Sequence, residues 1–240
     1  YTLLMALAAN FVTGPHLMPS AKYDPRSTFT PIGFIQRSAY YLIVGSDSPS
    51  RDLKSLLARA AAAPGTVSLG VPGFGTPHHL EAELIMRRAG VKFNLVPYPG
   101  TPQGVNELLG GRLDAYLDLA SGAVHSHIVP GRLRYLAMTG TRRASNRPDV
   151  PTFKELGIDG VDAYSWFGLV GPKGMPAPVT TRLSAVLGQA LQSKALRDQM
   201  LLEGIPEEGI ASGSPAELTQ WIGSEYERWG KLIQDANIKL

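Results

Sequence analysis

The chain has 240 residues, of which 44% are hydrophobic and 18% are charged. This composition is typical of a folded globular protein and excludes an intrinsically disordered one. The sequence contains no cysteine, which excludes disulfide frameworks, thiolate nucleophiles and cysteine-ligated zinc sites. Its 23 Lys and Arg residues exceed its 20 Asp and Glu residues by only 3. That net charge is too small for a nucleic-acid-binding surface, but it suits a small anionic partner.

The chain opens with an apolar stretch, Tyr1 to Val12, that is too short to span a membrane. The run Ala6-Leu7-Ala8-Ala9 has the small residues of a signal-peptide cleavage site, but no basic residue precedes it. The alternative, which we favour, is a buried β-strand over Tyr1–Leu7. Because a domain seldom opens so abruptly inside its core, we also expect that sequence upstream is missing from this chain.

Short apolar segments then alternate with amphipathic ones. We expect strands over 40–44, 66–71, 92–98, 115–119 and 133–139. Between them we expect a helix capped by Ser50, a helix over 76–88 closed by Gly90, a helix over 101–109, and a helical turn over 125–128. This alternation predicts a mostly parallel sheet with helices on both faces.

Loops rich in Pro and Gly follow at 146–151 and 157–160, and then a strand over 164–170. The remainder is expected to be mainly helical. Its last helix begins with Ser214-Pro215-Ala216-Glu217, which predicts a capping box with Pro at the first helical position. The buried stripe of that helix consists of Leu218, Trp221, Ile222, Trp229 and Ile233.

Two similar loops join predicted strands to predicted helices, Gly75-Thr76-Pro77 and Gly100-Thr101-Pro102. In each, Thr is expected as the N-cap and Pro as the first helical residue. If the two strands lie in one parallel sheet, both helix amino termini open on the same edge. That edge is where α/β proteins bind ligands.

The first of these loops belongs to a glycine-rich segment, Gly70 to His79. Glycines let a backbone approach a ligand with its N–H groups turned inward, and a helix start adds unpaired donors and a partial positive charge. A carboxylate or phosphate could bind there without a dedicated Arg or Lys. The alternative is a plain strand-to-helix turn with a Thr cap.

The histidines and acidic residues do not form a recognisable catalytic or metal site. His78 and His79 are adjacent and point in different directions on a helix, so they cannot chelate one metal ion. We expect no metal and no cofactor, and we expect His79 to hydrogen-bond the loop. Asp118, at the carboxyl end of a strand, could face a cleft and accept hydrogen bonds from loop N–H groups. As a single carboxylate without a partner, it is more typical of a structural role.

Trp166 lies in Ser165-Trp166-Phe167, where the chain would cross between two lobes. An aromatic pair at such a place is expected in the core, and it can also form the wall of a pocket. No nucleophile elbow, Walker A lysine or long dinucleotide fingerprint occurs in the sequence.

A series of short motifs in a fixed order resembles the Bug-type solute-binding receptors of tripartite tricarboxylate transporters. The resemblance runs over nearly the full length and is carried by Tyr1-Thr2-Leu3-Leu4, Tyr23-Asp24-Pro25, Phe29-Thr30-Pro31-Ile32, the Gly70–Leu80 loop, Val96-Pro97-Tyr98, Leu108-Leu109-Gly110-Gly111, Asp149-Val150-Pro151-Thr152, Ser165-Trp166-Phe167-Gly168-Leu169 and Pro172-Lys173-Gly174.

The resemblance implies an α/β, two-lobed type II periplasmic binding protein of the Venus-flytrap kind. Lobe 1 would comprise 1–38 and 165–240, and lobe 2 would comprise 39–164. The protein would be periplasmic, usually a monomer and not embedded in the membrane. It would capture a small organic carboxylate and deliver it to membrane permease subunits. Family members normally begin with a strand, glycine loop and helix that this sequence lacks, so lobe 1 is expected to be truncated.

The same resemblance implies the ligand-binding residues. The carboxylate-pinning loop corresponds to Gly73, Phe74, Gly75 and Thr76, with His79. Further motif positions near the cleft are Tyr98, Asp118, Ala9, Asn10 and Trp166. Ala9 and Asn10 stand where the family usually has Ser and Thr, so contacts from that loop differ from the family pattern.

The expected mechanism has no covalent step. One ligand carboxylate would sit on the N–H groups of Phe74 to Thr76, helped by the Thr76 hydroxyl and the helix dipole, and hinge closure would exclude water. Di- and tricarboxylates are the natural class, with aromatic acids and amino acids left open. One alternative is a hydrolase-like enzyme that pairs Ser165 or Thr76 with His79 or Asp118. The other is a ligand-sensing interaction module.

Overall fold

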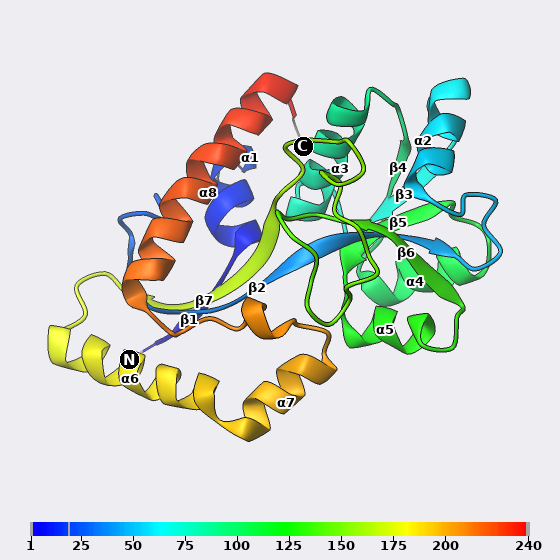
Figure 1. Ribbon diagram of the computed structural model, residues 1–240. Coiled ribbons are helices and arrows are strands. Elements are labelled where there is room, and N and C mark those ends of the chain that lie inside the picture. The colour runs from blue at the N-terminus through cyan, green and yellow to red at the C-terminus, as the bar shows by residue number, and fades with distance from the viewer. Residues whose placement is uncertain (1, 19, 239–240) are drawn as a thin grey trace. The chain divides into compact units, whose positions relative to one another are not determined.

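The computed structural model describes residues 2–18 and 20–238. Contacts within the chain divide it into two compact units (Figure 1). Unit 1 consists of Tyr1–Ser38 with Ser165–Leu240, and unit 2 consists of Ala39–Tyr164. The chain passes from one unit to the other inside the long strand β2 (Phe29–Gly45) and at the start of strand β7 (Tyr164–Pro172).

Unit 2 is an α/β sandwich built on one sheet. Besides the end of β2, its elements are α2 (Leu53–Ala62), β3 (Ser68–Val71), α3 (Pro77–Ala89), β4 (Asn94–Pro97), α4 (Thr101–Leu109), β5 (Ala115–Leu119), α5 (Gly122–Ile128) and β6 (Leu133–Met138). The strands follow the order β6-β2-β5-β3-β4.

The expectation of a mostly parallel sheet is wrong for unit 2, because its sheet is mixed. Strand β3 is parallel to both β4 and β5, whereas β2 is antiparallel to β5 and to β6. The helical crossovers between β3, β4 and β5 require parallel strands. They do not fix the direction of β2, which enters the sheet from the other unit.

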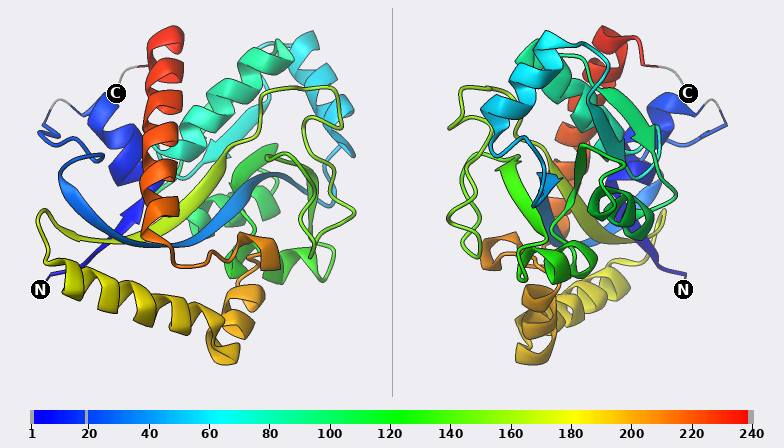
Figure 2. Two further views of the ribbon diagram at one scale, coloured as in Figure 1. Left: turned by 60° about the vertical axis from the view of Figure 1, so that its left-hand side comes forward. Right: turned by 90° about the vertical axis from the view of Figure 1, so that its right-hand side faces the viewer.

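Helices cover both faces of this sheet, as the alternation predicted (Figures 1 and 2). On one face, Val105 and Leu108 of α4 and Val124 of α5 pack against the sheet. The strand residues of that face include Tyr41 and Tyr116. Helices α2 and α3 lie on the opposite face.

Two predicted helix caps are wrong. The N-cap of α2 is Asp52, whose side chain accepts from the Ser55 N–H, while Ser50 is buried and bonds the Arg59 guanidinium instead. The N-cap of α4 is Gly100, so Thr101 is already helical. Asp offers a carboxylate to the first turn, and Gly needs no side chain to adopt the cap conformation.

Unit 1 contains β1 (Leu4–Leu7), η1 (Ala9–Thr13), α1 (Gly14–Leu17), the first part of β2, β7, α6 (Ala177–Gln192), α7 (Lys194–Leu202), η2 (Glu207–Gly209) and α8 (Pro215–Ala236). Strand β1 is antiparallel to β7, which lies next to β2. Its core is aromatic, with Phe11, Phe34, Trp166 and Trp229 fully buried.

The first strand is less buried than its sequence suggested. Leu4 is 39% and Met5 is 47% exposed, and only Ala6 of β1 is fully buried. The strand lies at the end of the strand order and pairs with β7 alone among the described strands. Tyr1, which the predicted strand included, lies outside the described residues.

The last helix begins as predicted, with Ser214 as the N-cap that accepts from the Glu217 N–H and Pro215 at the first helical position. The Glu217 carboxylate accepts from the Ser212 hydroxyl, so the reciprocal half of the predicted capping box is missing from the described hydrogen bonds. Trp221 is half-buried, and the rest of the predicted stripe is buried.

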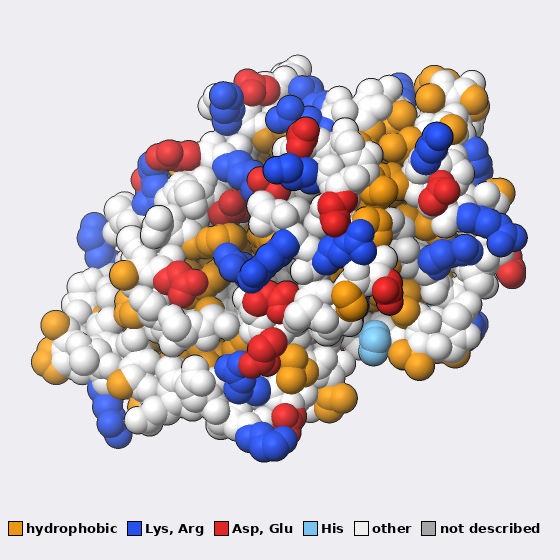
Figure 3. Space-filling model, viewed as in Figure 1, with side chains coloured by type: hydrophobic (Ala, Val, Ile, Leu, Met, Phe, Trp, Pro, Cys, Tyr) orange, Lys and Arg blue, Asp and Glu red, His pale blue; other side chains and the backbone are white. Residues whose placement is uncertain are grey.

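None of the helices in the described part of the chain is both long and apolar enough to cross a membrane. On the face shown in Figure 3, basic and acidic side chains are interspersed. No single-sign patch, which would attract an oppositely charged macromolecule, dominates that face.

The packing of α4 in unit 2 can be tested at Gly104, with Gly223 of α8 in unit 1 as the control. A Cβ added to Gly104 of α4 would lie 2.3 Å from the Tyr116 ring, whereas one added to Gly223 of α8 would meet nothing within 4 Å. We expect Gly104→Ala to lower the free energy of unfolding by about 1–3 kcal/mol through overpacking. Gly223→Ala should raise it by up to about 1 kcal/mol through helix propensity. Urea denaturation followed by circular dichroism measures both, and equal effects would contradict this packing.

Candidate functional site

The glycine loop that follows β3 has the backbone conformation its sequence predicted. Gly73 and Gly75 have φ values of 89° and 73°, in the left-handed region that favours glycine. Between them, Phe74 is 48% exposed. The chain therefore turns twice within three residues before α3 begins.

Thr76 fastens this loop to the helix. Its hydroxyl donates to the Gly73 carbonyl oxygen over 2.8 Å and accepts from the His79 N–H over 3.4 Å. The sequence predicted Thr76 as the N-cap, which is confirmed. The hydroxyl therefore stabilises the loop, because its one proton is already donated to the Gly73 carbonyl oxygen. The expected hydrogen bond from Thr76 to a ligand carboxylate would require this bond to break.

His79 hydrogen-bonds the loop, as expected. The Gly75 N–H donates to His79 Nδ1 over 3.2 Å, which requires an imidazole without a proton on Nδ1. Burial lowers the pKa of His79 below its ordinary value, because a desolvated charge is disfavoured. The neutral ring is therefore the form that fits this loop.

These bonds decide which loop amides remain as donors. The Gly75 amide is engaged by His79, whereas the amides of Phe74 and Thr76 have no protein acceptor among the described residues. Both lie at the amino terminus of α3, where the helix dipole adds a partial positive charge. The loop thus offers two amide donors, Phe74 and Thr76, one on each side of the occupied Gly75 amide.

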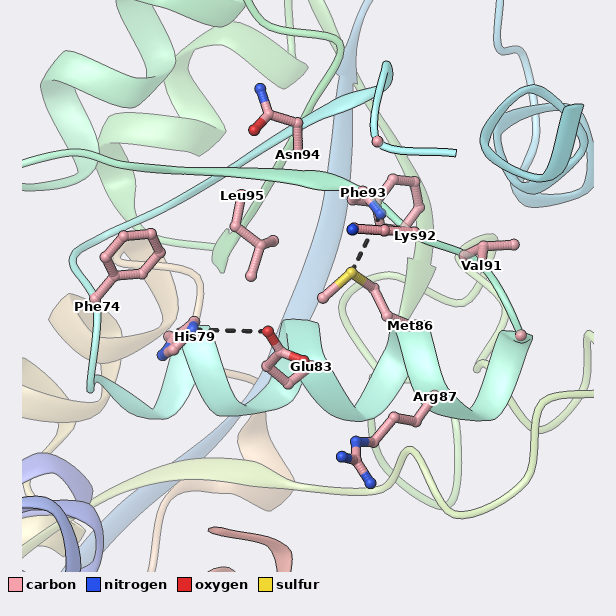
Figure 4. Close-up of a pocket in the computed structure, with 12 residues that line it drawn as sticks. Phe74, His79, Glu83, Met86, Arg87, Val91, Lys92, Phe93, Asn94 and Leu95 are labelled. Atoms are coloured by element: carbon pink, nitrogen blue, oxygen red, sulfur yellow. Dashed lines mark hydrogen bonds and ion pairs between the residues drawn. The ribbon is translucent and has the colours of Figure 1, made fainter. Parts of the chain in front are cut away.

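The other edge of His79 faces a cavity of about 830 Å³ between α3 and β4 (Figure 4). His79 Nε2 lies 3.9 Å from Glu83 Oε1. Burial raises the pKa of Glu83, and the charge of Arg87 opposes that rise. Phe74 and His79 line this cavity together with Met86, Phe93 and Leu95.

The second predicted loop lies beside the first, because β3 and β4 are adjacent parallel strands. The Tyr98 N–H donates to the Val71 carbonyl oxygen over 2.9 Å, which ties the two strand ends together. The Tyr98 ring packs against Tyr116, and burial raises the pKa of Tyr98. Both helix amino termini open on the edge that the sequence predicted.

Asp118 lies at the carboxyl end of β5, and it is not the isolated carboxylate that the sequence suggested. The Leu119 N–H donates to its Oδ1 over 2.7 Å, and His78 Nε2 lies 3.2 Å from the same oxygen. That separation allows an ion pair, although the ring is not oriented for a hydrogen bond. The contact arises because β5 neighbours β3, and His78 follows the β3 loop.

Sequence reasoning missed His78 because it considered the histidine pair only as a metal chelate. The usable signal was positional: His78 lies in the first turn after one strand, and Asp118 lies at the end of a parallel neighbour. Only the order of the strands shows that His78 and Asp118 meet, and the sequence alone does not give that order.

The remaining predicted residues belong to unit 1. Ala9 and Asn10 lie in the π-helical turn η1, and the Tyr23 hydroxyl donates to the Asn10 carbonyl oxygen. Trp166 is fully buried and packs edge-on against Phe11. Of the two expectations for Trp166, a core residue or a pocket wall, these contacts fit the core residue. Contact of these three residues with a ligand remains a prediction. In the described part of the chain, no three His, Asp or Glu side chains are placed to hold a metal ion.

The comparisons with known proteins agree with this fold. A family model described as "Tripartite tricarboxylate transporter family receptor" matches residues 1–238. Protein BugT of Bordetella pertussis is 31% identical over 241 residues, covering 100% of this chain. The solved structure of periplasmic binding protein BugD is 27% identical with a TM-score of 0.86, and an R. palustris protein solved with adipate is 28% identical with a TM-score of 0.87.

The chain spans 73%, 63% and 54% of the first three curated relatives that it matches, and 79% of each of those two solved chains. The matches confirm the resemblance seen in the sequence and the α/β, two-lobed solute-binding fold. The chain belongs to the family of tripartite tricarboxylate transporter receptors, among its Bug-type members.

Proposed function

We propose that this chain binds a small organic carboxylate at the glycine loop of unit 2 and presents it to the membrane permease of a tripartite transporter. The binding is reversible and involves no chemical step. The protein acts in the periplasm, as a monomer. The observation that carries this proposal is the pair of loop amides, Phe74 and Thr76, that have no protein acceptor among the described residues.

Two amides and a helix terminus are sufficient to hold one carboxylate. A hydrogen bond to a charged group contributes about 1.5–3 kcal/mol, and the helix terminus adds about 0.3–1 kcal/mol. The loop is also preorganised, since the Thr76 hydroxyl and the His79 ring already fix its backbone. Little ordering is then required when the ligand binds.

The carboxylate class is supported by the neighbouring structure that was solved with adipate, at 28% identity. That dicarboxylate is the ligand of the other protein. Isothermal titration calorimetry with succinate, adipate, citrate and benzoate tests the proposal. Binding of at least one, weakened by high salt, is expected. Binding of none of them would contradict it.

Replacing one loop glycine should abolish much of this binding, while a matched glycine elsewhere should not. Gly75 and Gly131 have φ values of 73° and 72°, so alanine at either position costs a similar left-handed strain of about 1–2 kcal/mol. We expect Gly75→Ala to weaken carboxylate affinity at least tenfold by displacing the Phe74 and Thr76 amides. Gly131→Ala should leave affinity within about twofold. Isothermal titration calorimetry on both variants measures the carboxylate affinity. Equal losses of affinity in the two variants would contradict binding at the glycine loop.

The neutral His79 predicts a pH dependence of stability. Its pKa is lowered in the fold from about 6.5 in the unfolded chain, so the unfolded state binds the proton first. The contribution of His79 is therefore fully present above about pH 6.5 and is lost as the pH falls toward the folded pKa. Urea denaturation at several pH values should show this slope, and His79→Gln should flatten it. An unchanged slope in the variant would contradict the neutral ring.

A further inference from the structure

One oxygen of Asp118 is a buried acceptor that the protein leaves without a donor. The residue is 2% exposed, and its Oδ1 accepts from the Leu119 N–H. Its Oδ2 has no hydrogen-bond partner in the described part of the chain. An unsatisfied buried polar group costs about 1–3 kcal/mol, and more when it is charged. Such a group in a folded protein therefore calls for a partner from outside the chain.

Among the described residues, no side chain donates a hydrogen bond to Asp118 Oδ2. The Tyr116 hydroxyl lies 3.5 Å from the Gly100 carbonyl oxygen. The Arg147 guanidinium lies over the rings of Tyr41 and Tyr135, 5.5 and 5.7 Å from their centroids, and donates to Asn146 Oδ1. Burial is the main cause that raises the pKa of Tyr116 and of Tyr135. The charge of Asp118 adds to both pKa shifts, a side-chain hydrogen bond with Asp118 adds to that of Tyr116, and Arg147 opposes that of Tyr135. The Asp118 carboxylate therefore lies close to the Tyr116 and Tyr135 side chains.

The Asp118 carboxylate lies at the sheet edge that carries the glycine loop. His78 follows Thr76 by two residues, and its Nε2 is 3.2 Å from Asp118 Oδ1. Strands β3 and β5 are parallel neighbours, so their carboxyl ends meet there. Both nitrogens of the His78 ring are buried and make no hydrogen bond within the described chain. The Asp118 carboxylate therefore lies at the same sheet edge as the loop that carries the Phe74 and Thr76 amides.

We propose that Asp118 is a specificity-determining residue, which selects carboxylates that carry a hydrogen-bond donor, a hydroxyl or an ammonium group, close to the bound carboxylate. This inference rests on the proposed function and narrows its substrate class to hydroxy and amino carboxylic acids. The loop amides take the negative group of such a ligand, and Asp118 Oδ2 takes its donor. A ligand without the donor leaves the buried oxygen unpaired, which is how polar sites reject analogues that lack a hydrogen-bonding group.

Matched ligand pairs test this on the full chain by calorimetry at pH 7. Malate and aspartate each add one donor group to succinate, and citrate adds a hydroxyl to tricarballylate. For the wild type we expect at least tenfold tighter binding of the donor-bearing member of a pair. In Asp118→Asn, aspartate should lose at least tenfold in affinity, while succinate should change by less than threefold.

Asp114→Asn is the matched control, because Asp114 flanks the same strand and its carboxylate already accepts from Arg59 and Ser68. It should leave the affinity ratios unchanged. Equal affinity for both members of each pair in the wild type would overturn the inference and leave Oδ2 to a buried water molecule. That comparison needs no variant, so it stands even if Asp118→Asn fails to fold. Binding of no carboxylate at all would instead contradict the proposed function.

Discussion

The hydrogen bond from the Gly75 N–H to His79 Nδ1 is the constraint on which the site depends. It joins a left-handed glycine to the first turn of the helix that follows, and it requires a neutral imidazole. Together with the bond from the Thr76 hydroxyl to the Gly73 carbonyl oxygen, it holds two consecutive peptide groups, Gly73–Phe74 and Phe74–Gly75. The amides on either side of Gly75 are then held as donors, without any Arg or Lys at the loop.

The proposed site takes an anion although the net charge of the chain is only +3. The positive potential comes from oriented peptide groups and a helix terminus, which are fixed by the fold. Fixed dipoles need no reorganisation when a ligand arrives, and they keep the site free of long, mobile basic side chains. The cost is that the loop tolerates few substitutions at its glycines.

Local sequence patterns predicted the parts of this site that depend on neighbouring residues. Thr76 before Pro77 identified the cap of α3, and Gly90 identified its end. The contact of His79 with the loop followed from its position in the first turn. Patterns misassigned Ser50 and Thr101, because a nearby Asp52 and Gly100 satisfy the same cap positions. Two cap candidates so close together in the sequence cannot be ranked without the backbone angles.

The parts that depend on strand order could not be predicted in this way. The direction of β2 and the meeting of His78 with Asp118 both follow from which strands are neighbours. The spacing of hydrophobic residues indicates which face of each helix or strand is buried, but it does not indicate the order of the strands in the sheet. The sequence presents Asp118 as a single carboxylate for this reason, because its contact with His78 depends on the order of β3 and β5.

The most direct measurement is an amide NMR titration of the ¹⁵N-labelled chain with the tightest-binding carboxylate. Binding at the loop predicts saturable downfield shifts of the Phe74 and Thr76 amide protons, with a midpoint equal to the calorimetric Kd. Unchanged Phe74 and Thr76 amides, with saturable shifts confined to residues outside the loop, would contradict the account.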